Sequence, residues 1–179
     1  MSDDFRIVPA SARWLLIIGG IAILIPFTIL ISLFIVDGKK VMDPLAVSIL
    51  IASMLLLAGV LSVVFRSARS ATFEISSEGL RLKGDFFGRL IPLATLEIER
   101  GRIIDLSVDK EFKPRWKTCG SSFPGYQSGW FRLKNKEKAL LYLTDQKKVV
   151  HLPTKKGYCL LLSPANPERF LEVLKRYRL

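Results

Sequence analysis

The chain has 179 residues, of which 50% are hydrophobic, and a formal net charge of +11. This length accommodates one ordinary domain together with one or two membrane segments, and it leaves no room for a second full domain. The apolar residues are concentrated before residue 66, whereas the positive charge lies after it. The mean hydropathy of +0.31 therefore averages two very different regions.

The basic excess belongs entirely to the second region. The residues before 66 are neutral, because their charges balance: Arg6, Arg13, Lys39 and Lys40 against Asp3, Asp4, Asp37 and Asp43. A basic domain beside a bilayer is attracted to anionic lipid by roughly 1 kcal/mol per Lys or Arg near the surface. The alternative explanation of this positive charge is membrane topology, because cytoplasmic segments near a membrane span carry Lys and Arg that set its orientation. Nucleic-acid binding is disfavoured, because no helix or loop is patterned for base or phosphate contacts.

Two uncharged segments predict a membrane hairpin. Trp14–Val36 is long enough to cross a bilayer of about 30 Å as a helix, with a bend expected at Pro26. Leu45–Phe65 is the second predicted span, and Asp37–Pro44 is the short loop that makes the two helices antiparallel. Residues 1–13 are then an N-terminal tail, residues 66–70 a linker, and residues 71–179 the domain.

The positive-inside rule orients this hairpin. Arg6 and Arg13 precede it and further basic residues follow it, whereas the connecting loop carries only Lys39 and Lys40. Both termini and the domain are therefore predicted to be cytoplasmic. A reducing compartment would keep the two cysteines, Cys119 and Cys159, as thiols.

The domain is predicted to be mainly β. Short segments with period-two alternation, separated by polar turns, are typical of strands with one buried face. They are Thr72–Ser76, Leu80–Lys83, an apolar segment interrupted at Pro92, Arg100–Val108, Trp130–Lys134, Ala139–Thr144, Val149–Leu152 and Tyr158–Leu162.

A helix is predicted after the last strand. Asn166 suits the N-cap, with Ser163 as an alternative, Pro167 suits the first helical position, and Glu168 complements the positive end of the helix dipole. Apolar residues at helical spacing form one stripe that is expected to close the sheet: Phe170, Val173, Leu174 and Tyr177.

Asp109–Gly129 is predicted to be a long irregular loop, in which cationic and aromatic residues alternate. Long loops in compact domains are uncommon and are often functional. Such residues can touch a bilayer interface, form a peptide-binding or intersubunit surface, or fold back onto the sheet as a local core. The residues predicted to contact a partner or lipid are Lys113, Arg115, Trp116, Lys117, Tyr126, Arg132 and Lys134.

Several motifs resemble those of the bacterial PH domain family, in a membrane-anchored member. They are GWFRLKNKEKALLYLTD, VVHLPTKKGYCLLLSPANPERFLEVL, FEISSEGLRLKG and RLIPL, and the resemblance covers Ala71–Leu179. It implies a pleckstrin-homology-like fold: a bent antiparallel sandwich or partial barrel with one C-terminal helix. The family often has Gly after the Lys-Asn pair, where this chain has Lys136. The resemblance supplies no catalytic residues.

No catalytic, cofactor or metal site is predicted. Cys119 or Cys159 with His151 could be drawn as a nucleophile and base. However, Cys159 lies in an apolar strand, which indicates an inert buried thiol, and the alternation around His151 predicts a solvated side chain. The cysteine spacing fits no zinc motif, and there is a single histidine.

The sequence therefore predicts a non-enzymatic protein: a membrane-anchored PH-like module for binding or scaffolding at the cytoplasmic face of a bacterial inner membrane. There it is expected to contact a protein partner or anionic lipid. The alternative is a structural subunit of a larger membrane complex, assembled through the hairpin. Small residues four apart in the second span, Ser48/Ala52 and Ala58/Ser62, allow close helix packing there.

Overall fold

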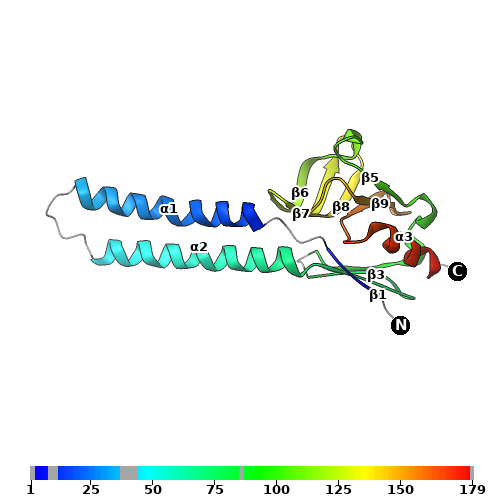
Figure 1. Cartoon of the computed structure of the whole chain (residues 1–179), viewed down its shortest axis with the longest axis horizontal. Helices are drawn as coiled ribbons and strands as arrows, with labels where there is room; N and C mark the ends of the chain where they lie inside the picture. The colour runs from blue at the N-terminus through cyan, green and yellow to red at the C-terminus, as the bar shows by residue number, and fades with distance from the viewer. Residues whose placement is uncertain (1–2, 8–11, 37–43, 85–86, 178–179) are drawn as a thin grey trace. The chain divides into compact units, whose positions relative to one another are not determined.

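The computed structural model describes residues 3–7, 12–36, 44–84 and 87–177, and the chain divides into two compact units (Figure 1). Residues 11–66 form a helical unit, and residues 1–10 and 67–179 form a β-rich domain. The helices are α1 (Ala12–Val36), α2 (Pro44–Ser70) and α3 (Pro167–Arg176). The strands are β1 (Asp3–Arg6), β2 (Thr72–Ser76), β3 (Gly79–Lys83), β4 (Arg89–Pro92), β5 (Arg102–Ile104), β6 (Pro114–Phe123), β7 (Tyr126–Leu133), β8 (Lys138–Leu143), β9 (Val149–Pro153) and β10 (Tyr158–Leu162).

The helical unit contains the two helices expected from the apolar segments. α2 is longer than predicted, because residues 66–70, the expected linker, continue the helix. Among the residues that the structure describes, no helix combines the length and apolarity needed to cross a membrane. The two spans therefore stay a prediction from the sequence, and the predicted loop 37–44 lies outside the described residues except for Pro44.

The N-terminal segment is part of the β-rich domain, which corrects the prediction of a tail over residues 1–13. β1 pairs antiparallel with β2, with Phe5 opposite Phe73, and so forms the edge of a four-stranded sheet in the order β1-β2-β3-β4. Ile7 then forms a bridge with Pro164, just before α3. The helical pair is therefore inserted between two neighbouring strands of one sheet, rather than placed before the domain.

The second sheet has six strands in the order β5-β9-β10-β8-β7-β6. Four of its neighbouring pairs are antiparallel, but β10 runs parallel to β8. The prediction of a wholly antiparallel sheet is therefore wrong at this pair. β9 and β10 form a hairpin, and β10 rather than β9 lies beside β8.

The six-stranded sheet has a core on each face. On its first face, alternate residues of β8, β9 and β10 pack against the four-stranded sheet and α3, which closes one end of the space between the sheets (Figure 1). On its second face, the intervening residues pack with Ile104 of β5 and with two side chains from the segment between β5 and β6, Leu106 and Phe112. As a result β9 is buried at all its positions.

α3 begins and packs as predicted. The side chain of Asn166 accepts a hydrogen bond from the backbone N–H of Arg169 at 3.0 Å, and Pro167 is the first helical residue. Phe170 is fully buried, with its ring 5.2 Å from that of Phe5 and 5.9 Å from that of Phe73. Ser163 is no cap, because its hydroxyl donates to the backbone oxygen of Asp145.

Candidate functional site

The stretch predicted to be a long loop is mostly strand. A 3-10 turn, Lys110–Phe112, leads into β6, which pairs with β7 along its whole length and forms one edge of the six-stranded sheet. Two register irregularities interrupt the pairing, one on either side of Trp116 and Lys117. Such bulges bend a strand and re-aim its side chains, and they also protect an edge from pairing with another chain.

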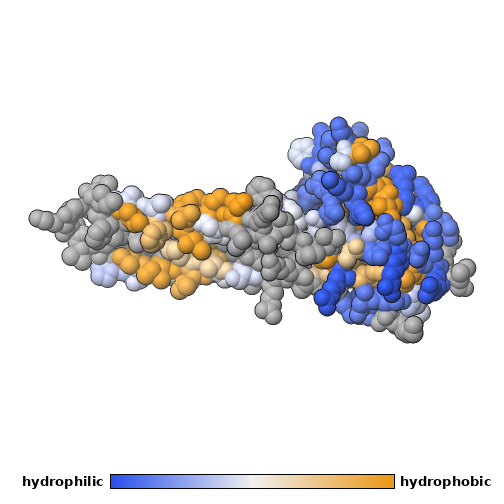
Figure 2. Space-filling model, in the orientation of Figure 1, coloured by the Kyte–Doolittle hydropathy of each residue, from blue (hydrophilic) through white to orange (hydrophobic). Residues whose placement is uncertain are grey.

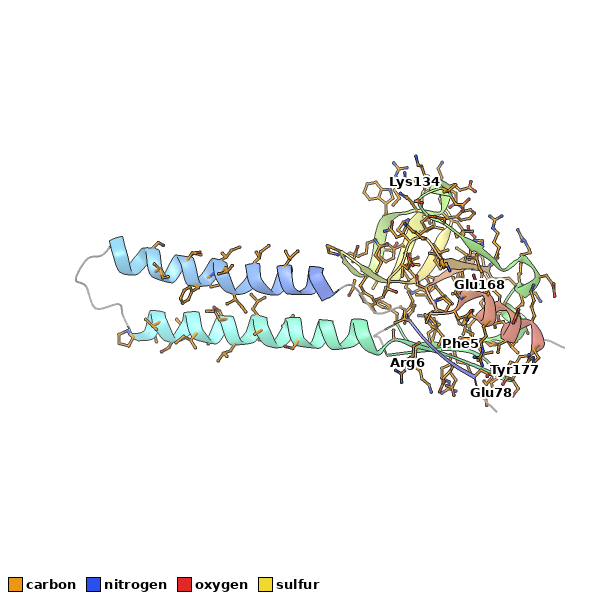
Figure 3. All side chains as sticks on the ribbon, viewed as in Figure 1. Phe5, Arg6, Glu78, Lys134, Glu168 and Tyr177 are labelled. Carbon is orange, nitrogen blue, oxygen red and sulfur yellow. The ribbon has the colours of Figure 1, made fainter. Side chains whose placement is uncertain are left out.

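The structure gathers most of the predicted contact residues at one end of this β6–β7 ribbon. We call them the basic ribbon patch, and its members are Lys113, Arg115, Trp116, Lys117, Arg132 and Lys134. Trp116 pairs in register with Arg132, and the backbone N–H of Lys134 donates to the oxygen of Lys113 at 3.0 Å. Figure 3 shows Lys134 at the outer end of the domain, away from Phe5 and Tyr177.

Trp116 is the most unusual member of the basic ribbon patch, because 65% of its surface is exposed. The guanidinium of Arg115 lies 5.7 Å from the centre of its ring. Arg132 is held by its own hydrogen bond to the backbone oxygen of Lys136 at 3.0 Å. In the part of the chain that the structure describes, no carboxylate forms a salt bridge with these cations. The patch therefore presents an exposed aromatic residue with a guanidinium beside its ring and further cations on the same end of the ribbon.

Tyr126 does not belong to this patch. It lies at the start of β7, at the opposite end of the ribbon, and only 3% of it is exposed. Phe112, which the sequence placed in the same stretch, is likewise buried in the second core. The local-core interpretation is thus correct for these two aromatic residues and wrong for Trp116.

A second aromatic group with cations was missed from the sequence. The centre of the Trp130 ring lies 4.4 Å from the amine of Lys138 and 5.0 Å from the guanidinium of Arg89. The ring of Tyr158 meets its edge at 5.1 Å. These residues come from β4, β7, β8 and β10, so no local sequence pattern could predict the group. Both cations already contact the Trp130 ring. We therefore interpret this group as a stabilising contact within the domain, and not as a surface for a partner.

Two hollows lie elsewhere on the domain. One of about 470 Å³ is lined by Leu93, Glu97 and Arg100, among others, and its Glu97 and Arg100 side chains pair with each other at 2.6 Å. The other, of about 370 Å³, is lined by Tyr126 and its neighbours. Neither hollow contains a member of the basic ribbon patch.

His151 and Cys159 are close together, and neither has the environment of a reacting group. His151 is buried, which corrects the prediction of a solvated side chain. Burial, with Arg102 and Arg100 nearby, lowers the pKa of His151 to about 4. Burial, together with the carboxylate of Glu137, raises the pKa of the Cys159 thiol. A neutral thiol is a poor nucleophile, so the inert role predicted for Cys159 fits its surroundings. Cys119 is an exposed thiol in β6.

The fold thus defines a β module in which two sheets are closed by one C-terminal helix, with a basic surface at the end of a strand ribbon. Residues 72–178 match the sequence profile described as Bacterial PH domain, and the chain belongs to that family. The predicted resemblance to this family is confirmed over these residues. Such domains are generally binding modules without catalysis, and they bind proteins or lipids. No curated protein and no solved structure matches the chain.

Proposed function

We propose that the protein is a membrane-anchored binding or scaffolding module without catalytic activity, and that the basic ribbon patch docks an acidic segment of a protein partner. The observation that carries the proposal is Trp116, which is 65% exposed, with the guanidinium of Arg115 5.7 Å from the centre of its ring. Large exposed aromatics and Arg are enriched where proteins bind one another, because the ring supplies apolar contact and the cation supplies specificity.

Membrane anchoring is supported by the apolar surface of the helical unit. The described side chains of α1 and α2 are mostly hydrophobic and exposed, including Leu24, Leu55 and Leu56 (Figure 2). Hydroxyl groups on both helices donate to carbonyl oxygens of their own helix, as Thr28 does to Leu24 at 2.9 Å and Ser62 to Ala58 at 2.8 Å. Internal satisfaction of polar groups suits an apolar surrounding, where water is absent.

The pairing of β1 with β2 adds a condition on topology. A bilayer cannot separate two strands that share a ladder, so α1 and α2 would cross together and leave both termini on one side. The Lys and Arg distribution favours the cytoplasmic side of a bacterial inner membrane for that domain.

Cys119 provides a test of this orientation, since it is exposed and Cys159 is buried. In cells with a permeabilised outer envelope, a membrane-impermeant maleimide should label Cys119 only after lysis. Labelling without lysis would contradict the orientation.

Photo-crosslinking in cells tests the docking surface. A photoreactive phenylalanine analogue replaces Trp116, and the matched control replaces Val108, which is 76% exposed and lies outside the patch. We expect Trp116 to give a crosslink to one defined protein and Val108 to give none. Equal products from both positions, or none from Trp116, would overturn the proposed surface.

Anionic lipid is the second candidate ligand, and the net charge of +11 favours it. A crosslink from position 116 to phospholipid would select it over a protein. Arg115→Glu with Lys117→Glu should then reduce binding of the full chain to anionic vesicles more than Lys155→Glu with Lys156→Glu, and salt should weaken binding. A fragment that begins at Ala71 is unsuitable, because it lacks β1. The alternative function, a structural subunit assembled through the hairpin, predicts a different result. A fixed partner should then co-purify in mild detergent, and replacing Ala52 or Ala58 by a bulky residue should abolish that co-purification.

A further inference from the structure

The second face of the six-stranded sheet holds a polar cluster inside an otherwise apolar core. Glu137 directly precedes β8, His151 lies in β9, and Cys159 begins the buried part of β10. Because β10 lies between β8 and β9, these three positions come from adjacent strands. Cys159 pairs in register with Ala139 and with Pro153, while His151 pairs with Leu161.

This register places the three side chains on one face. Positions two apart along a strand point to the same side of a sheet, so Glu137 shares the face of Ala139, and Cys159 shares that of Leu161. Diagonal neighbours on adjacent strands lie close enough for their side chains to meet. One carboxylate oxygen, one imidazole nitrogen and the thiol sulfur all lie within 4.8 Å of one another.

His151 provides an independent observation that points to a ligand. Only 6% of the residue is exposed, and neither Nδ1 nor Nε2 has a hydrogen-bond partner among the residues that the structure describes. The ring of Phe112 covers it at a centroid distance of 4.7 Å and offers no acceptor. Buried polar groups are nearly always paired, and an imidazole with two unpaired nitrogens calls for a partner at that place.

We propose that Glu137, His151 and Cys159 bind a thiophilic divalent cation of the Zn²⁺ class. Thiolate, imidazole and carboxylate are the three protein ligand types that Zn²⁺ takes, and neither Mg²⁺ nor Ca²⁺ favours the sulfur and nitrogen pair. Metal–ligand bonds of about 2.0–2.3 Å place tetrahedral ligand atoms roughly 3.5 Å apart, so a small contraction of the cluster suffices.

The charges of the cluster suit a buried cation. Binding replaces the thiol proton of Cys159, which is released, by a bond from the thiolate to the metal. A thiolate, a carboxylate and a neutral imidazole then balance two positive charges. The cations nearest His151 are Arg102 and Arg100; both are exposed, and Arg100 is paired with Glu97 at 2.6 Å, so solvent weakens their repulsion.

Glu137 forms the entrance of this site. It is half-buried, whereas the other two residues are buried, and the amide of Asn135 donates to its carboxylate at 3.4 Å. A cation can therefore arrive from the turn between β7 and β8. Three protein ligands leave a fourth position for water on the exposed side. The inference does not depend on the basic ribbon patch or on its partner.

Cobalt titration of the full chain in detergent, after treatment with a chelator, tests the proposal. Co²⁺ bound to a thiolate gives a near-ultraviolet charge-transfer band and visible bands of tetrahedral character. We expect both bands, and we expect one equivalent of Zn²⁺ to remove them. Cys119→Ser is the matched control and should leave the bands unchanged, since Cys119 lies exposed in β6.

Variants of the proposed ligands distinguish the loss of a metal ligand from the loss of the fold. Cys159→Ala should abolish the charge-transfer band. Glu137→Gln, at a half-buried turn position, should keep the fold by circular dichroism and weaken Co²⁺ binding by at least tenfold, since even outer-shell changes typically cost about 10–100-fold. The proposal is overturned if the wild-type chain gives no bands, if Cys119→Ser removes them, or if Glu137→Gln binds Co²⁺ as tightly as the wild type.

Discussion

The two faces of the six-stranded sheet differ in what they enclose. The first face packs against a second sheet and a helix, and its core contains large apolar side chains such as Leu160, Leu162 and Phe170. The second face is covered by a short irregular segment, and its core contains the imidazole of His151 beside Phe112. The comparison teaches that one sheet can bury apolar clusters on both faces while one of them, the second, also encloses an imidazole and a thiol.

The largest effect is expected on the first face, from Phe170→Asp. A Phe→Ala change in a core typically costs about 3–5 kcal/mol, and a buried carboxylate adds to that cost. Because Phe170 on α3 is fully buried against Phe5 of β1 and Phe73 of β2, we expect the domain to lose its cooperative unfolding transition. Thermal unfolding followed by circular dichroism measures this. The control is Arg169→Asp, an exposed neighbour that should melt near the wild type.

On the second face we expect a change of opposite sign. His151→Leu removes two buried nitrogens without hydrogen-bond partners and adds apolar contact with the second core. An unsatisfied buried polar group costs about 1–3 kcal/mol, so the metal-free variant should gain stability of order 1 kcal/mol. Urea unfolding in the presence of a chelator measures it. A clear loss of stability would mean that His151 has a structural partner, and it would weaken the contrast between the faces.

A smaller effect is expected at the start of α3, which covers the first face. Asn166→Ala removes the cap that accepts from Arg169, and such changes typically cost about 1 kcal/mol. Urea unfolding should show a lower midpoint with an unchanged slope. Asn166→Asp should retain most of the stability, because its carboxylate also accepts that bond. Equal stability of the Ala variant would refute the cap.

The smallest effect is expected in the turn that leads to the second face. Lys136 has a φ of 69°, in the left-handed region that favours glycine. Lys136→Gly should therefore stabilise the chain by about 0.5 kcal/mol, the strain relieved being partly offset by the greater freedom of glycine when unfolded. Lys134→Gly, directly after β7, is the matched control, and it should lower the stability or leave it unchanged. A loss of stability in Lys136→Gly would contradict this account of the turn.

Local patterns predicted most of the domain. Period-two alternation located β2, β3, β7, β8, β9 and β10, and cap chemistry located the first residue of α3. The same patterns could not find β1, because Asp3–Arg6 is short and its partner comes after the whole helical pair. Nor could they find that β10 pairs with β8, since alternation carries no information about which strands are neighbours.

The candidate sites show the same limit. The sequence singled out Trp116 and its cations because cations with an aromatic residue form a local pattern, and the structure leaves Trp116 exposed. Their contact with a partner or lipid stays a prediction. It missed β6, since prolines, glycines and basic residues are typical of loops and the two irregularities break alternation. It misjudged His151, because alternation assigns a residue to a face without telling whether that face is covered. The cluster with Glu137 and Cys159 exists only through strand pairing.

The place of β1 has a consequence for the order of events during synthesis. Asp3–Arg6 leaves the ribosome first, yet its hydrogen-bonding partner, β2, follows both helices. At roughly 5–20 residues per second, the strand waits several seconds with Phe5 and Ile7 exposed. The domain cannot complete its first sheet until both helices have been synthesised and Arg6 has met Thr72. Synthesis of α1 and α2 is therefore a precondition for completing a sheet to which neither helix contributes a strand.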